Sequence, residues 1–98
     1  MSLFTSGLSF SVGALHRVGT IGKEDGYAVA KIRAAGAIPL LVSNTPEYCT
    51  SWETDNFITG RTLNPHNSSR TPGGSSGGEV RLFKIFLIST LPKIVCSF

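Results

Sequence analysis

Six small residues in a row constrain this chain more than any other feature of its sequence. Residues 73–78 read Gly-Gly-Ser-Ser-Gly-Gly, with Pro72 before them and Glu79 after them. Glycine lets a backbone turn tightly, but a run like this supplies no large side chain to a hydrophobic core. By composition alone, the run predicts a flexible linker.

Two functional motifs share part of this pattern. A phosphate-binding loop requires a lysine directly after its last glycine, and none follows Gly78. The esterase pattern G-x-S-x-G occurs twice, at 73–77 and at 74–78. That pattern belongs between a strand and a helix, with the catalytic histidine downstream. Here residues 64–72 do not resemble a strand and both histidines lie upstream, so neither motif is favoured.

Charge and glycine content divide the chain into two parts. Its 98 residues allow one small domain, and residues 1–79 carry six basic and six acidic side chains. The net charge of +3 therefore comes from residues 80–98, which contain no glycine and are mostly apolar. We expect a partial domain over 1–79 and an unmatched apolar, basic tail over 80–98, for which translated intron sequence is one hypothesis. A basic tail without a basic surface does not predict nucleic-acid binding.

The sequence shows no targeting or membrane-spanning segment. The first residues lack the basic and apolar regions of a secretory signal, and the tail lacks the roughly 20 apolar residues that a bilayer requires. An intracellular location is therefore favoured, although the tail could lie on a membrane. Cys49 and Cys96 lack metal-ligand spacing with the histidines. We expect free thiols, no metal and no cofactor.

The clearest predicted element is a helix over residues 24–35, followed by a strand over 37–42. Asp25 is the expected N-cap, and Gly36 is the expected left-handed residue after the helix. The helix has one apolar stripe, formed by Ala28, Val29, Ile32 and Ala35. A helix, a glycine turn and a buried strand together indicate the α/β class.

The rest of the chain gives weaker signals. Residues 43–48 resemble the start of a second helix, capped by Asn44 or Thr45 with Pro46 in its first turn. Residues 8–12 are weakly strand-like, and residues 53–72 read as loop. Aromatic side chains beside a short helix are expected in the core, which concerns Tyr48 and Trp52.

A longer series of motifs surrounds the glycine-serine run. In chain order they are Arg33-Ala-Ala-Gly-Ala-Ile-Pro-Leu40, Asn44-Thr45, Glu47, Cys49, Trp52-Glu53, Asp55-Asn56, Gly60-Arg-Thr62, Asn64-Pro65 and Arg70–Glu79. This order and spacing resembles the amidase signature family, and within it the fatty-acid amide hydrolases, over about residues 5–79.

The resemblance implies an α/β/α sandwich with a mixed sheet. About 79 residues would supply only one or two of its strands, so we do not expect an autonomous fold. It also implies hydrolysis of a small-molecule amide by a Ser–Ser–Lys triad without a cofactor. Ser75 matches the bridging serine, with a cis bond between Gly74 and Ser75. The residues that support this motif are Gly73, Gly74, Ser76, Gly77 and Gly78.

The sequence also departs from the family pattern. The family nucleophile lies in an Asp-x-Gly-Gly-Ser segment, which does not occur after Glu79, and the family lysine lies upstream of the stretch matching Thr5. Lys23 and Lys31 read as solvated residues of the predicted helix region. We therefore expect a piece of an amidohydrolase that is inactive alone, with the bond before Ser75 relaxed to trans or disordered. One alternative is a non-enzymatic product that binds a membrane or a protein through residues 80–98. Another is complementation by a second chain that supplies the lysine and the nucleophile.

Overall fold

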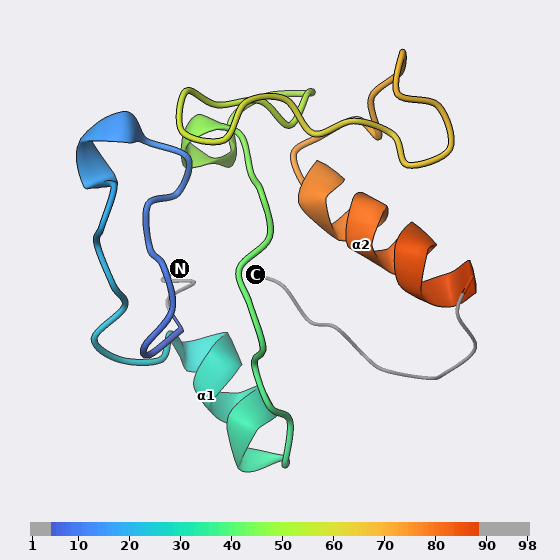
Figure 1. Cartoon of the computed structure of the whole chain (residues 1–98). Coiled ribbons are helices and arrows are strands. Elements are labelled where there is room, and N and C mark those ends of the chain that lie inside the picture. Colours follow the sequence, from blue (N-terminus) through green and yellow to red (C-terminus); the bar gives the residue numbers. More distant parts are fainter. Residues whose placement is uncertain (1–4, 89–98) are drawn as a thin grey trace.

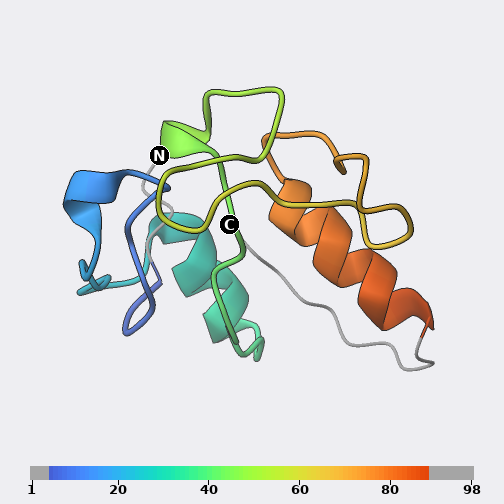
Figure 2. The same cartoon turned by 45° about the horizontal axis from the view of Figure 1, so that its top comes forward.

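The structure is a computed structural model that describes residues 5–88, and expectations for residues 89–98 lie outside this range. Its elements in chain order are the 3-10 turn η1 (Leu15–Arg17), helix α1 (Tyr27–Ala34), the 3-10 turn η2 (Glu47–Cys49) and helix α2 (Gly77–Ile88). Loops and extended segments make up the rest. Figures 1 and 2 show the extended segment after α1 running back between the N-terminal loops and α2.

The mixed sheet implied by the family resemblance is not seen among residues 5–88. The pairing there is limited to isolated bridges, which join Ser6 to Gly22, Ser9 to Ile21, and Asn64 to Asn67. Within the described range, the backbone of residues 38–42 makes no hydrogen bond to another segment, and Ala37 donates only to Ile32 at the end of the preceding helix. Ile38 and Leu40 are 77% and 63% exposed. A strand forms only beside a hydrogen-bonding neighbour, and the described residues provide none, so the strand assignment is wrong for this structure.

Helix α1 confirms the predicted helix, although it is shorter than residues 24–35. Gly36 has a φ of +96°, as expected for the residue that follows a helix. Its N–H donates to the carbonyl of Arg33 at 2.9 Å, and the N–H of Ala37 donates to the carbonyl of Ile32 at 3.1 Å. These two bonds form a Schellman motif, which satisfies the last carbonyl groups of the helix.

The prediction that Asp25 caps α1 is wrong. The N-cap is Gly26, which has no side-chain capping bond. The Asp25 carboxylate instead pairs with Arg33 two turns later, with 2.6 Å between Nε and Oδ2, and it accepts the Ser6 N–H at 2.8 Å. A carboxylate gains more from a charged guanidinium than from one backbone N–H. The predicted apolar stripe is only partly covered: Val29 is buried, whereas Ala35 is exposed.

The helix expected to start at residues 43–48 is only a short 3-10 turn, so this prediction is wrong. In η2, Pro46 occupies the N-cap position and no side chain caps the turn, so neither Asn44 nor Thr45 plays the expected role. Tyr48 has a φ of +50°, which no continuing α-helix can contain. Its N–H donates instead to the carbonyl of Val12 at 2.9 Å. This bond ties η2 to the N-terminal loop.

Helix α2 begins inside the glycine-serine run and continues past residue 80. Glu79 lies in its first turn, where a negative charge favours the helix dipole. Oε1 of Glu79 is buried and has no hydrogen-bond partner among residues 5–88. No helix within these residues has the length and apolar character that crossing a bilayer demands.

The few buried apolar side chains of this fold predict thermal unfolding of low cooperativity. The buried hydrophobic side chains of the described residues are Ala14 and Val29, whereas Trp52 and Phe57 are 92% and 89% exposed. We therefore expect the purified 98-residue chain to melt without a cooperative transition. Circular dichroism at 222 nm and calorimetry measure this directly. A folded domain of this size would absorb about 60–80 kcal/mol at its midpoint, and a single peak of that size would contradict the expectation.

Candidate functional site

The glycine-serine run forms a closely packed loop that leads into α2. The peptide bond between Gly74 and Ser75 is cis, as the resemblance implies, so the expectation of a trans or disordered bond is wrong. Gly77 and Gly78 are buried, Ser75 is half-buried, and Gly74 and Ser76 are exposed. The Val80 N–H donates to the Ser76 carbonyl at 3.2 Å, which places Ser76 just before the helix. The linker predicted from composition alone is therefore not what the structure contains.

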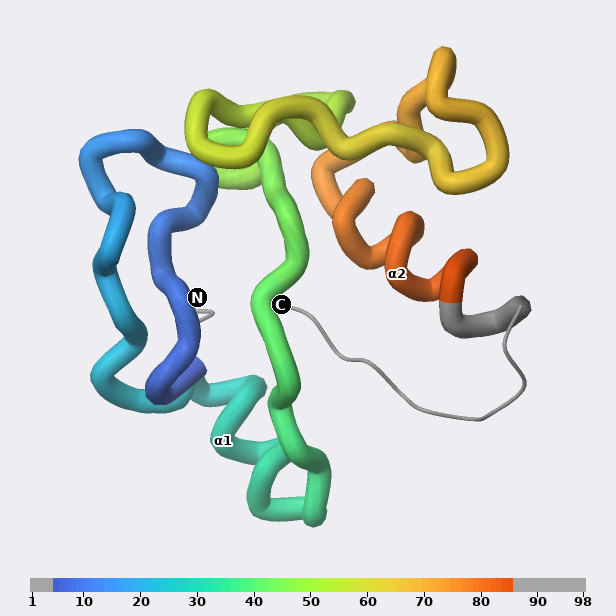
Figure 3. The backbone as a smooth tube through the Cα atoms, viewed as in Figure 1, coloured from blue at the N-terminus to red at the C-terminus, as the bar shows by residue number. Residues whose placement is uncertain are grey.

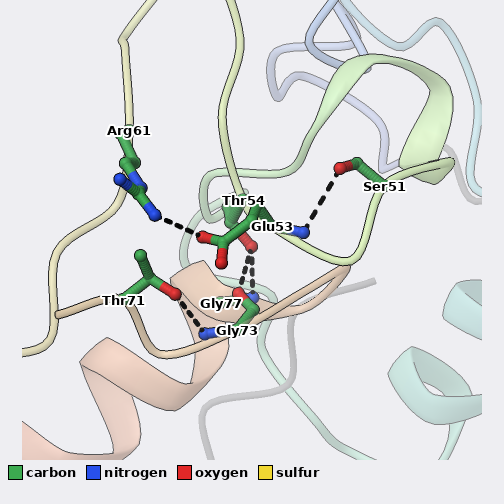
Figure 4. Close-up of polar contacts among 7 residues, drawn as sticks. All are labelled: Ser51, Glu53, Thr54, Arg61, Thr71, Gly73 and Gly77. Atoms are coloured by element: carbon green, nitrogen blue, oxygen red, sulfur yellow. Dashed lines mark hydrogen bonds and ion pairs between the residues drawn. The ribbon is translucent and has the colours of Figure 1, made fainter.

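The Thr54 hydroxyl connects the two ends of this loop. Thr54 is 0% exposed, and its Oγ1 donates to the carbonyl of Gly73 at 2.9 Å. The same oxygen accepts the N–H of Gly77 at 2.8 Å and lies 3.4 Å from the carbonyl oxygen of Ser75. Figure 4 shows the two contacts of this hydroxyl, one with Gly73 and one with Gly77. One side chain thus holds backbone atoms on both sides of Ser75.

Close contacts explain three of the glycines: Gly74 and Gly78 lie against backbone atoms, and Gly77 lies against the Thr54 side chain. A Cβ at Gly74 would lie 2.7 Å from the carbonyl carbon of Trp52 and 2.8 Å from backbone atoms of Glu53. A Cβ at Gly78 would lie 2.5 Å from backbone atoms of Asn44, and one at Gly77 would collide with Thr54. Real Cβ atoms do not approach other atoms so closely. Any larger residue at these positions would push the loop away from residues 52–54 or from Asn44.

Two asparagines organise the loops beside the run. Asn56 donates to Oδ1 of Asn44 and to the carbonyl of Thr45, both at 2.7 Å. Asn44 donates to Oγ1 of Thr62 at 2.9 Å and to the carbonyl of Gly60 at 3.2 Å. Asn44 and Asn56 thus hold together the loops that contain Thr45, Gly60 and Thr62.

Glu53 ties the stretch after Trp52 to two other segments. Its carboxylate accepts a hydrogen bond from the Thr71 hydroxyl and lies 3.1 Å from Nη2 of Arg61. The Thr71 hydroxyl also accepts the N–H of Gly73 at 3.1 Å. The hydrogen bond from Thr71, and after it the hydrogen bond from Arg61, lowers the pKa of Glu53 below its ordinary value of 4.5. Figure 4 shows this group beside the Thr54 contacts.

Four other residues singled out by the sequence are exposed. Lys23 and Lys31 are exposed, as predicted. The expectation that Trp52 and Tyr48 belong to the core is wrong, because they are 92% and 50% exposed. The Tyr48 hydroxyl lies 3.1 Å from Nε2 of His16 and forms a hydrogen bond with it.

A pocket of about 240 Å³ lies beside the asparagine network. Loop segments 9–13 and 42–45 line it, together with Cys49, Asn56, Ile58 and Thr59. Figure 3 shows the course of the backbone through these segments. A search of the described part of the chain finds no group of three His, Cys, Asp or Glu side chains that could hold a metal ion.

The contacts of Thr54 could not be predicted from the sequence. The motifs Trp52-Glu53 and Asp55-Asn56 lie on either side of this threonine, but no local pattern marks the threonine itself. Its partners lie 19 and 23 residues further along the chain, so only the folded arrangement brings them together.

Comparisons with known proteins agree with the resemblance. The profile of the family described as Amidase matches residues 2–82. Human "Fatty-acid amide hydrolase 2" is 44% identical over 73 residues, which cover 74% of this chain and 14% of the human protein. Chicken "Vitamin D3 hydroxylase-associated protein" is 42% identical over 69 residues, or 70% of this chain and 15% of the relative. Pig "Fatty-acid amide hydrolase 1" is 38% identical over 69 residues, which cover 70% of this chain and 12% of the relative. The chain thus spans a small part of the length of each relative.

The lowered pKa of Glu53 predicts a pH-dependent stability. The test uses a hybrid protein, in which residues 5–82 of this chain replace the corresponding segment of the human relative. A carboxylate whose pKa is lowered by folding stabilises the folded state above its ordinary pKa, and this contribution disappears as the pH falls through the lowered value. We expect Glu53→Gln to lower the melting temperature of the hybrid at pH 7 but to have progressively less effect below pH 4.5.

Thr71→Val provides the control, because the hydrogen bond from the Thr71 hydroxyl is the largest cause of the lowered pKa of Glu53. In that background, the effect of Glu53→Gln on the melting temperature should be smaller at pH 7. Melting curves recorded by scanning fluorimetry between pH 3.5 and 7.5 measure both effects. An effect of Glu53→Gln that stays constant over this range would contradict the assignment.

Proposed function

The chain belongs to the amidase family, and from this premise we propose that it is a segment of a serine amidohydrolase in which Ser75 is the bridging serine. The reaction is hydrolysis of the C–N bond of an amide. The proposed substrate is a fatty-acid amide, which is the substrate class in the name of the human relative. In this proposal residues 1–79 form the partial amidase domain and residues 80–98 form a tail outside it.

The proposed mechanism moves one proton through Ser75. A neutral lysine, kept uncharged by burial, accepts a proton from the Ser75 hydroxyl. Ser75 in turn accepts the proton of a second serine, since a hydroxyl both donates and accepts hydrogen bonds. The second serine attacks the amide carbonyl, the C–N bond breaks as the proton held by the lysine passes to the leaving amine, and water then cleaves the acyl-enzyme to the free acid.

The hydrogen bonds at the two ends of residues 73–77 are the observation that supports this role. Ser75 is half-buried between two residues, Gly73 and Gly77, that bind the same Thr54 hydroxyl. A proton relay must keep its oxygen in one place relative to both partners. A loop with both ends held by one buried side chain meets that requirement, whereas a flexible linker does not.

Substitution of the relay serine tests the proposal. We expect the hybrid protein to hydrolyse a fatty-acid amide and Ser75→Ala to lower its kcat/KM by about 10²–10⁴-fold, the usual contribution of a positioned acid–base group. Ser68→Ala is the matched control, because Ser68 is an exposed serine in the preceding loop. Release of the amine product over time measures both variants.

Two results of this experiment would contradict the proposal. One is a folded hybrid, with the melting temperature of the human protein, that has no amidase activity. The other is Ser75→Ala with the same kcat/KM as Ser68→Ala.

The 98-residue polypeptide on its own is proposed to be inactive. Its sequence contains no Asp-x-Gly-Gly-Ser segment, so the 98 residues do not include a match to the family nucleophile. Loss of a nucleophile leaves at most the residual rate that binding and the oxyanion hole supply. We expect no stoichiometric labelling by a fluorophosphonate and no turnover of a fatty-acid amide.

An active hybrid, labelled in parallel, shows that both reagents are competent. Stoichiometric labelling of the 98-residue polypeptide, located by mass spectrometry on one of its serines, would overturn the expectation.

A further inference from the structure

We propose that Thr54 is a positioning residue for the amidase reaction, because its hydroxyl fixes the loop that carries Ser75. This inference rests on the proposed role of Ser75. Thr54 itself touches neither the substrate nor the reacting atoms in this proposal. It acts through Gly73 and Gly77, the residues two positions before and two positions after Ser75.

The contacts of Thr54 close a small ring of atoms that contains the backbone of the relay serine. Oγ1 lies 2.9 Å from the carbonyl oxygen of Gly73 and 2.8 Å from the nitrogen of Gly77. The segment from Gly73 to Gly77 therefore begins and ends with a hydrogen bond to this one oxygen. With both ends held at one atom, the three residues between them have few arrangements left, and Ser75 is the middle one.

Only a hydroxyl can make both contacts at this place. The carbonyl of Gly73 needs a donor and the N–H of Gly77 needs an acceptor, and a hydroxyl offers both from one atom. Valine has the same shape but neither function. A longer polar side chain does not fit, because Thr54 is fully buried and already lies against Gly77.

Loss of the Thr54 hydroxyl would displace the loop, and not only lower its stability. Removing one partner of a buried hydrogen bond leaves the other groups unsatisfied. The carbonyl of Gly73 and the N–H of Gly77 would then have to move toward other partners. A displacement of about 1 Å at a reacting group can lower a rate by about 100-fold.

The position of Thr54 is itself fixed by the neighbouring loop. The N–H of Thr62 donates to the carbonyl of Thr54 at 2.8 Å. Thr62 is also buried, and its hydroxyl accepts a hydrogen bond from Asn44. Thr62 therefore offers a matched comparison: a buried threonine with a hydrogen-bonded hydroxyl that does not contact residues 73–77.

The test compares three variants of the hybrid protein. Thr54→Val should lower kcat by about 10- to 100-fold while KM changes less than about twofold, because the loop that carries the relay moves and not the substrate contacts. Thr54→Ser restores the hydroxyl and should recover kcat to within a few-fold of the unsubstituted hybrid. Thr62→Val removes the hydroxyl that binds Asn44 but keeps the backbone N–H that donates to Thr54, so it should destabilise the protein without lowering kcat.

Hydrogen exchange gives a readout that does not depend on activity. Mass spectrometry of the peptide that covers residues 73–79 should show faster exchange in Thr54→Val than in the unsubstituted hybrid or Thr62→Val. Thr54→Ser should exchange at the unsubstituted rate.

Three outcomes would overturn the inference: unchanged kcat in Thr54→Val, an equal loss of kcat in Thr62→Val, or unchanged exchange over residues 73–79 in Thr54→Val. An inactive unsubstituted hybrid would instead contradict the proposed function. The exchange measurement still reports on the Thr54 contacts in that case, so the two failures are distinguishable.

Discussion

The hydrogen bonds of Asn44 and Asn56, to each other and to neighbouring segments, join the loops on which the rest of the described structure depends. Asn56 donates to Asn44 and to the backbone of Thr45, and its own Oδ1 accepts the N–H groups of Ile58 and Thr59, both at 2.9 Å. A carboxamide has two donors and an oxygen with two lone pairs, so one side chain can satisfy several backbone groups. This capacity matters here because the described residues bury few large apolar side chains. Polar side chains therefore do the joining that a hydrophobic core does in most domains.

The same network sets the place of the glycine-serine loop. Asn44 lies against Gly78 through its backbone, and the N–H of Thr62 holds the carbonyl of Thr54. Thr54 then holds Gly73 and Gly77. The start of α2 is thus bounded on one side by Asn44 and on the other by Thr54. Because Gly77 and Gly78 lack Cβ atoms, the Thr54 side chain and the Asn44 backbone can lie closer to this loop than any other residue type would permit.

The local structure of α1 was predicted well from the sequence, whereas the side-chain and strand partners of residues were not. The periodic apolar residues before Gly36 predicted α1, and the left-handed conformation of Gly36 completed the expected helix end. Asp25 was assigned as a cap because of its position in the sequence, but Arg33 takes its carboxylate in the folded chain. The stretch 37–42 has the composition of a buried strand, yet strand formation requires a neighbouring strand. Residues 5–88 offer none, and the apolar side chains of this stretch are largely exposed.

The candidate site shows the same division within a few residues. The order and spacing of the motifs between residues 33 and 79 were enough to identify the family and the role proposed for Ser75, because that series is specific. Thr54 lies in residues 53–72, where no periodicity exists, and its function depends on groups 19 and 23 positions away. Side chains that bind the backbone of a distant loop leave no repeat in the sequence. The same composition of glycine and serine is found in flexible linkers and in this held loop, and the difference lies in partners elsewhere in the chain, here the Thr54 hydroxyl at both ends of the run.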